Sequence, residues 1–207
     1  MSSIEPFRDQ KVIVIGGSSG VGRSIATAAL AQGASVVIAS SSPDKVTAAI
    51  KLLREGSKNA SGISVKGQAF DIKDSAALTA FLSQEAPFDH LVITAGAMPV
   101  GTSLKRPLPG WALTCGPVGA LATVTRGLAL DLKPIRVNSI CMGLIDTELF
   151  NAFPREAREA LFQSQREVLP VGHIGLPNEV AEAYIFAMKC TYLTGQIITV
   201  DGGASLV

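Results

Sequence analysis

Short runs of apolar, β-branched residues alternate along the chain with longer segments in which apolar residues recur every three or four positions. The runs predict buried strands at Lys11–Ile15, Ser35–Ala39, about Ser64–Phe70, Asp89–Thr94, Ile135–Cys141 and Gln196–Val200. The segments predict helices from the glycine turn to Gly33, from Pro43 to about Glu55, and at about Ser75–Gln84, Trp111–Leu132, Pro154–Glu167 and Pro177–Met188. Such alternation predicts an α/β fold with a three-layer, doubly wound parallel sheet, in one domain covering residues 1–207.

Composition and charge narrow the class of ligand. Apolar residues make up 47% of the chain and charged residues 17%, as expected for a sheet covered by helices on both faces. The formal net charge of +1 argues against nucleic acid as a partner. No apolar run reaches the roughly 18 residues that cross a bilayer, and the first residues lack the apolar core of a secretion signal, so we expect a cytoplasmic protein without a membrane partner. The three cysteines have no metal-ligand spacing, so we expect no metal site and interpret them as small buried residues.

A glycine-rich turn follows the first predicted strand and opens the first helix. Its glycines are Gly16, Gly20 and Gly22, separated by Ser18, Ser19 and Val21 among others. Glycines here allow a tight turn, a close approach of backbone to a ligand, and close packing of helix on strand. The helix N-terminus adds unpaired N–H groups and partial positive charge. The turn therefore predicts a site for the phosphates of a dinucleotide; a glycine turn without a ligand is the alternative.

The spacing Gly-x-x-x-Gly-x-Gly resembles the short-chain dehydrogenase/reductase family, and later segments extend the likeness over most of the chain. These segments are Asp71 with Ile72, Thr94-Ala95-Gly96, Arg136-Val137-Asn138, Met142 to Thr147, Thr194-Gly195-Gln196 and Asp201-Gly202-Gly203. The resemblance implies a Rossmann-type fold and a nicotinamide cofactor. It also implies that Asp71 and Ile72 meet the adenine and that further cofactor contacts come from Thr94, Ala95, Gly96, Gly143, Ile145 and Thr147.

The end of the second predicted strand distinguishes the two nicotinamide cofactors. An acidic residue there would bond the ribose 2′-hydroxyl and repel a 2′-phosphate. This chain instead has Ser40, Ser41 and Ser42, followed by Lys45. Three hydroxyls and an amine suit a phosphate, which favours NADP over NAD, while Ser42 also suits the cap of the next helix.

The catalytic groups that the resemblance implies are missing. Ordinary family members pair a tyrosine with a lysine four residues later, and an unassisted tyrosine is a poor acid at neutral pH. The only tyrosines, Tyr184 and Tyr192, have no such lysine. Thr125 to Leu128 resemble the stretch that follows the family's lysine, and their position implies that Thr114 stands where the tyrosine should be. The segment around it is similar to that of tyrosine-less members from bacteria and fungal natural-product biosynthesis.

Other candidates for the catalytic site lie near this segment. Ser103, Arg106 and Thr114 are the catalytic candidates, and Trp111 is a candidate for the floor of a substrate pocket. For each there is a plainer interpretation: Ser103 as a loop serine, Arg106 as a solvated charge and Trp111 as a core or interface residue. Cys115 lacks a visible partner that would activate it as a nucleophile.

One helix–strand unit is predicted to be absent. Only 14 residues separate Gly96 from Trp111, where the family has a helix and a strand, and such a unit with its connections takes roughly 25 to 40 residues. A shortened natural form and a sequence that skips a segment would both fit.

Three functions follow as hypotheses. The first is an NADP(H)-dependent oxidoreductase that moves hydride to or from a carbonyl, imine or alcohol of a small apolar substrate. Apolar residues of a lid-like segment suggest that substrate, although they could simply pack the segment: Leu149, Phe150, Phe153, Leu161 and Phe162. The second is an NADP(H)-binding regulatory protein without chemistry, and the third a cyclase or isomerase that uses the same pocket. A homo-oligomer is expected from the resemblance, weakened by the missing unit.

Overall fold

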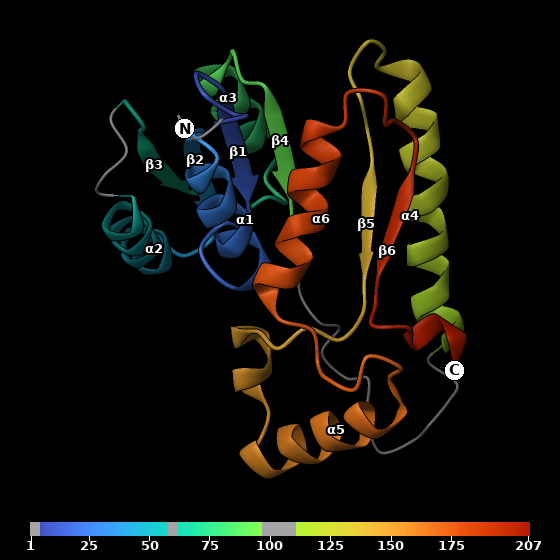
Figure 1. Ribbon diagram of the computed structural model, residues 1–207. Helices are drawn as coiled ribbons and strands as arrows, with labels where there is room; N and C mark the ends of the chain where they lie inside the picture. Colours follow the sequence, from blue (N-terminus) through green and yellow to red (C-terminus); the bar gives the residue numbers. More distant parts are fainter. Residues whose placement is uncertain (1–4, 58–61, 97–110) are drawn as a thin grey trace.

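The first half of the chain forms a four-stranded parallel sheet. The computed structural model describes residues 5–57, 62–96 and 111–207, with backbone only for residues 111–118. Its first elements are β1 (Lys11–Ile15), α1 (Gly20–Ala31), β2 (Ser35–Ser40), α2 (Pro43–Gly56), β3 (Val65–Ala69), α3 (Ser75–Glu85) and β4 (His90–Ile93). The strand order is β3-β2-β1-β4, and every pairing is parallel. The predicted strand and helix positions in this half are therefore confirmed to within two residues (Figure 1).

The second half adds a separate two-stranded parallel sheet. Its elements are α4 (Trp111–Asp131), β5 (Ser139–Met142), η1 (Glu148–Ala152), α5 (Arg155–Val168), α6 (Pro177–Lys189), β6 (Ile197–Val200) and η2 (Ala204–Leu206). β5 pairs only with β6 in the described part of the chain. The predicted strand from Ile135 begins four residues later than expected, at Ser139, because its partner β6 begins at Ile197, the residue that pairs with Ser139.

Two apolar layers cover the first sheet, one on each face. Val12 and Val14 of β1 point into a cluster that includes buried residues of α1 and α6, and fewer from α2. Ile13 and Ile15 alternate to the other face, where Phe81 of α3 covers them. This alternation follows from the two-residue period of a strand and makes the three layers of a Rossmann-type fold. The predicted fold class is thus confirmed.

Polar side chains define several helix ends. Asp74 accepts hydrogen bonds from the N–H groups of Ala76 and Ala77, both at 3.0 Å, and so caps α3. Ser42 accepts from the N–H of Lys45 at 3.4 Å, as predicted for the cap of α2. At the C-terminus of α6, the guanidinium of Arg136 donates to four carbonyl oxygens: those of Ala187, Met188, Cys190 and Leu193, at 2.8 to 3.1 Å. Arg136 therefore holds the C-terminus of α6 beside β5.

The two sheets are not joined, and this agrees with the predicted loss of one unit. Among the described residues β4 forms no ladder with β5, and Figure 1 shows them apart, with α6 between them in that view. Apolar side chains beside this break stay exposed: Ile93 of β4 has 55% of its surface accessible and Val124 of α4 has 50%. A strand between β4 and β5, with a helix over it, would complete a single sheet and cover such residues.

The described residues also bear on the cysteine, metal and membrane predictions. Cys141 and Cys190 are free thiols and half-buried, so the interpretation as fully buried residues is wrong for these two. No group of potential metal ligands occurs in the described parts of the chain. Among the same residues, no helix has the length and apolar character needed to span a bilayer.

Candidate nucleotide-binding site

The glycine turn is built so that two of its glycines cannot carry a side chain. Gly16 has a φ of +94°, in the left-handed region, and its N–H donates to the carbonyl of Ala39 at 2.7 Å. A Cβ on Gly22 would lie 2.2 Å from the carbonyl oxygen of Gly16 and 2.6 Å from the hydroxyl of Thr94. The first turn of α1 therefore packs directly on the end of β1, which leaves its N-terminal N–H groups at the carboxyl edge of the sheet.

The end of β2 lies beside this turn. The hydroxyl of Ser18, which is buried, donates to the hydroxyl of Ser40 at 2.9 Å. Ser41 and the side chain of Lys45 are exposed, at the start of α2. The structure thus brings one of the predicted serines into contact with the glycine turn and leaves Ser41 and Lys45 open to a ligand at the same edge.

The residues at the end of β4 lie against the other side of the glycine turn. A Cβ on Gly16 would lie 2.6 Å from the backbone nitrogen of Ala95, and the Thr94 hydroxyl donates to the carbonyl of Ile15 at 3.3 Å. Gly96 and Ala95 are exposed. This segment therefore lies against the turn as the family resemblance implies.

The residues after β5 approach the same turn from a distant part of the sequence. A Cβ built on Gly20 would be 3.2 Å from the methyl group of Thr147. Gly143 lies against Asp201, where a Cβ would come within 2.8 Å of that residue's Cα. Ile145 is buried and forms a bridge with Gly175, so only its backbone is available to a ligand.

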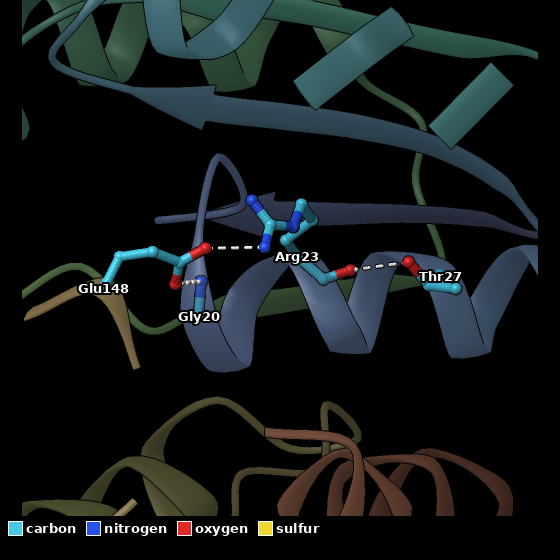
Figure 2. A network of polar contacts seen from close by, with 4 residues as sticks. All are labelled: Gly20, Arg23, Thr27 and Glu148. Carbon is cyan, nitrogen blue, oxygen red and sulfur yellow. Dashed lines mark hydrogen bonds and ion pairs between the residues drawn. The ribbon is translucent and has the colours of Figure 1, made fainter. Parts of the chain in front are cut away.

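A carboxylate already sits at the N-terminus of α1. One oxygen of Glu148 accepts from the N–H of Gly20 at 2.8 Å, and the other pairs with the guanidinium of Arg23 at 2.6 Å (Figure 2). Partial burial acts to raise the pKa of Glu148, but backbone hydrogen bonds and the Arg23 contact outweigh it and hold the pKa below its usual value. The contact shows that this helix end accepts an anion, which is the property a phosphate site needs. Sequence reasoning missed both residues.

Asp71 and Ile72 lie at the end of β3, the edge strand of the first sheet. The carboxylate of Asp71 is exposed and accepts from the N–H of Lys73 at 3.0 Å, which forms a turn. Ile72 packs against the cluster under α3. Asp71 is therefore accessible at the edge of the sheet that carries the glycine turn.

The catalytic candidates are less well placed. Ser103 and Arg106 lie outside the described residues, as do the side chains of Thr114, Trp111 and Cys115. Burial raises the pKa of Tyr184 to about 12, so its phenol is a poor proton donor at neutral pH. Tyr192 is fully exposed on a turn.

The aromatic residues of the lid-like segment pack on one another. Phe150 and Phe162 are buried, with ring centres 5.3 Å apart, and Phe153 and Leu161 cover them. Leu149 alone of the five predicted residues is largely exposed. The structure thus favours the packing interpretation of this segment over an apolar ligand site.

Fold and site together define a Rossmann-type α/β protein with its glycine-rich turn at the carboxyl edge of the sheet. A family model described as SDR-like rossmann domain matches residues 84–207, and one described as short chain dehydrogenase matches residues 10–112. The chain belongs to the short-chain dehydrogenase/reductase family, whose members bind nicotinamide cofactors.

Individual relatives agree with this assignment. The chain is 29% identical to the short-chain dehydrogenase/reductase ATR9 of Stachybotrys chlorohalonatus, over 97% of this chain and 98% of the relative. The solved structure of MalC reductase/Diels-Alderase from Malbranchea aurantiaca has a TM-score of 0.87 and 25% identity, and covers 99% of this chain and 100% of its own. An NADPH-bound short chain oxidoreductase of Pseudomonas aeruginosa, described as containing an atypical catalytic center, has a TM-score of 0.80 at 22% identity, with 95% and 96% coverage.

The alignment with ATR9 also bears on the missing unit. It runs over 250 positions while this chain has 207 residues, so at least 43 positions of the alignment have no residue of this chain. That excess is enough for one helix, one strand and their connections, which take roughly 25 to 40 residues.

Proposed function

We propose that this protein binds NADP(H) at the turn between β1 and α1 and acts as an atypical oxidoreductase on a small molecule. The observation that carries the proposal is the anion-binding end of α1, where the Gly20 N–H and Arg23 already hold a carboxylate. The packing of Gly22 on Gly16 supports it, because a side chain at either position would push the first turn of α1 away from the ends of β1 and β4.

The preference for NADP over NAD rests on the end of β2. Ser40 lies there in place of an acidic residue, with Ser41 exposed next to it and Lys45 in the first turn of α2. The next carboxylate along the chain, Asp44, is in that first turn, where its negative charge stabilises the helix through the partial positive charge of the N-terminus. Hydroxyl and amine groups suit a 2′-phosphate, which a carboxylate at Ser40 would repel.

When bound, NADPH supplies a hydride to a carbonyl or imine carbon, and the matching proton comes from water, the substrate or the cofactor ribose. The chain's own part is to bind and orient, since neither tyrosine has a lysine four residues later and burial raises the pKa of Tyr184 to about 12. Thr114, Ser103 and Arg106 remain our candidates for polarising the substrate, and Thr147 with the backbone of Gly143 and Ile145 for holding the nicotinamide end.

A second candidate is a non-redox, ring-forming reaction that uses the cofactor pocket for positioning. It is favoured by the similarity to MalC of Malbranchea aurantiaca, a protein described as both a reductase and a Diels-Alderase. A third candidate is binding without chemistry, which is favoured because β4 and β5 form no ladder among the described residues, so that the sheet carrying the glycine turn ends at β4 there.

The test is to titrate the purified chain with NADPH and NADH by nucleotide fluorescence, and then to follow absorbance with a panel of ketones and imines. NADPH binding with turnover would support the oxidoreductase. Binding without turnover would favour the regulatory or ring-forming alternatives, and a failure to bind either nucleotide would refute the proposal.

A further inference from the structure

The N-terminus of α1 lacks the capping groups that helices ordinarily provide for themselves. Ser19 stands at the cap position with no side-chain hydrogen bond to the helix, and the first turn contains no acidic residue. The carboxylate that meets the free N–H of Gly20 comes instead from Glu148, which is 128 positions away in the sequence. A nonlocal side chain therefore satisfies the group that a phosphate would need.

Glu148 binds this helix end with both of its oxygens. One accepts from a backbone N–H and the other from a guanidinium, and both bonds are short, at 2.8 and 2.6 Å (Figure 2). The same donor pair, a helix N–H and an arginine, is well suited to neighbouring oxygens of a phosphate. The Arg23 side chain stands in the first turn of α1 and is partly exposed, which leaves it free to change partners.

Glu148 is also the first residue of η1, which leads into the lid-like segment. Thr147 packs on Gly20, and Phe150 anchors η1 in the cluster with Phe162 of α5. Displacement of the Glu148 carboxylate from Gly20 would therefore act on the segment that borders the pocket. The contact links occupancy of the phosphate site to the position of η1.

We propose that Glu148 occupies the phosphate position in the nucleotide-free protein, and that Arg23 passes from Glu148 to a phosphate of the nucleotide when it binds. Arg23 is thereby assigned as a phosphate ligand and Glu148 as a competing anion. The inference rests on the proposed nucleotide-binding function and adds two residues to that site.

The experiment measures NADPH affinity for the full chain, E148Q, R23Q and the double variant E148Q/R23Q. Glu148→Gln removes the competing charge, so the dissociation constant for NADPH should fall. We expect a fall of roughly three- to tenfold, because the nucleotide no longer has to displace a carboxylate from the helix N-terminus and from a partly exposed ion pair with Arg23. In the E148Q background, R23Q should raise the dissociation constant roughly tenfold, because a charge-assisted bond to phosphate is lost. Glu156→Gln, an exposed glutamate of α5, is the matched control and should leave affinity unchanged.

A second measurement separates competition from a purely structural role. Thermal unfolding of E148Q without ligand should occur at a slightly lower temperature than that of the full chain, whereas inorganic pyrophosphate should stabilise E148Q more. A structural role alone would weaken both stability and binding.

The outcomes distinguish this inference from the proposed function. If the full chain binds NADPH and E148Q binds it equally or more weakly, Glu148 is no competitor, and the inference fails while the function stands. If R23Q has no effect in the E148Q background, Arg23 is not a phosphate ligand. If none of the four proteins binds NADPH or NADH, both ideas are overturned.

Discussion

The same substitution, glycine to alanine, should have opposite effects at two helical positions of this chain. At Gly22 of α1 the new Cβ would lie 2.2 Å from the carbonyl oxygen of Gly16, a backbone atom that cannot move without opening the turn. At Gly127 of α4 nothing lies within 4 Å of the new Cβ, and the position is exposed. Local helix propensity favours alanine at both, by about 1 kcal/mol or less.

Overpacking at Gly22 costs about 1 to 3 kcal/mol, against a gain in helix propensity of about 1 kcal/mol or less, so we expect a net loss of up to about 2 kcal/mol. Gly127→Ala should stabilise the protein by about 0.5 to 1 kcal/mol. For a chain of this length, the midpoint of thermal unfolding changes by roughly 2 to 4 °C per kcal/mol. G22A should therefore unfold several degrees below the unmodified protein, and G127A at or slightly above it.

Circular dichroism at 222 nm measures both midpoints, and NADPH fluorescence measures the effect on binding. G22A should also weaken NADPH binding, whereas G127A should not. An unfolding midpoint of G22A equal to or above that of G127A would show that Gly22 does not pack directly on the carbonyl oxygen of Gly16.

Four further predictions follow from other contacts. Ser40→Asp should shift the ratio of NADPH to NADH affinity towards NADH by about tenfold or more, as measured by fluorescence titration, because a carboxylate at the end of β2 repels the 2′-phosphate; Ser83→Asp on α3 is the control. Tyr184→Phe should leave turnover unchanged in steady-state assays, since burial raises the pKa of this tyrosine to about 12 and its phenol is no acid at neutral pH. Burial lowers the pKa of His90 below its usual 6.5. The contribution of His90 to the free energy of unfolding should therefore be fully present above pH 6.5 and decline as the pH falls, because the unfolded chain takes up the proton first. In unfolding experiments at several pH values, His90→Gln should reduce the slope of the free energy of unfolding against pH. Size-exclusion chromatography with light scattering should show weak self-association, because we expect one helix–strand unit beside β4 to be absent and, with it, part of the surface through which we expect the chain to assemble.

Each of these has an outcome that would count against it. A nucleotide preference unchanged in S40D, or changed equally in S83D, would remove the end of β2 from the cofactor site. A large loss of turnover in Y184F, with the fold intact, would show that this tyrosine acts in the reaction. An unaltered pH slope in H90Q would mean that other groups control acid stability, and a stable tetramer would show that assembly does not need the missing unit.

The sequence alone determined the order and type of the elements and the position of the glycine turn. Both depend on local patterns: the two-residue period of buried strands, the helical period of α1 and α6, and glycines where a tight turn meets a helix start. The family motifs, spread over most of the chain, indicated the fold class before any geometry was known. The short connection after Gly96 also predicted the loss of one helix–strand unit.

Only the tertiary structure decided which distant groups meet. Glu148 reaches Gly20, and Arg136 reaches the last carbonyls of α6, across separations at which no local period relates the two residues. The aromatic residues of the lid-like segment turned out to pack on one another, because Phe150 and Phe162 come together only when η1 and α5 fold back. Such contacts depend on how the elements pack together. The pattern of residues within one element predicts that element but does not show which other elements it contacts.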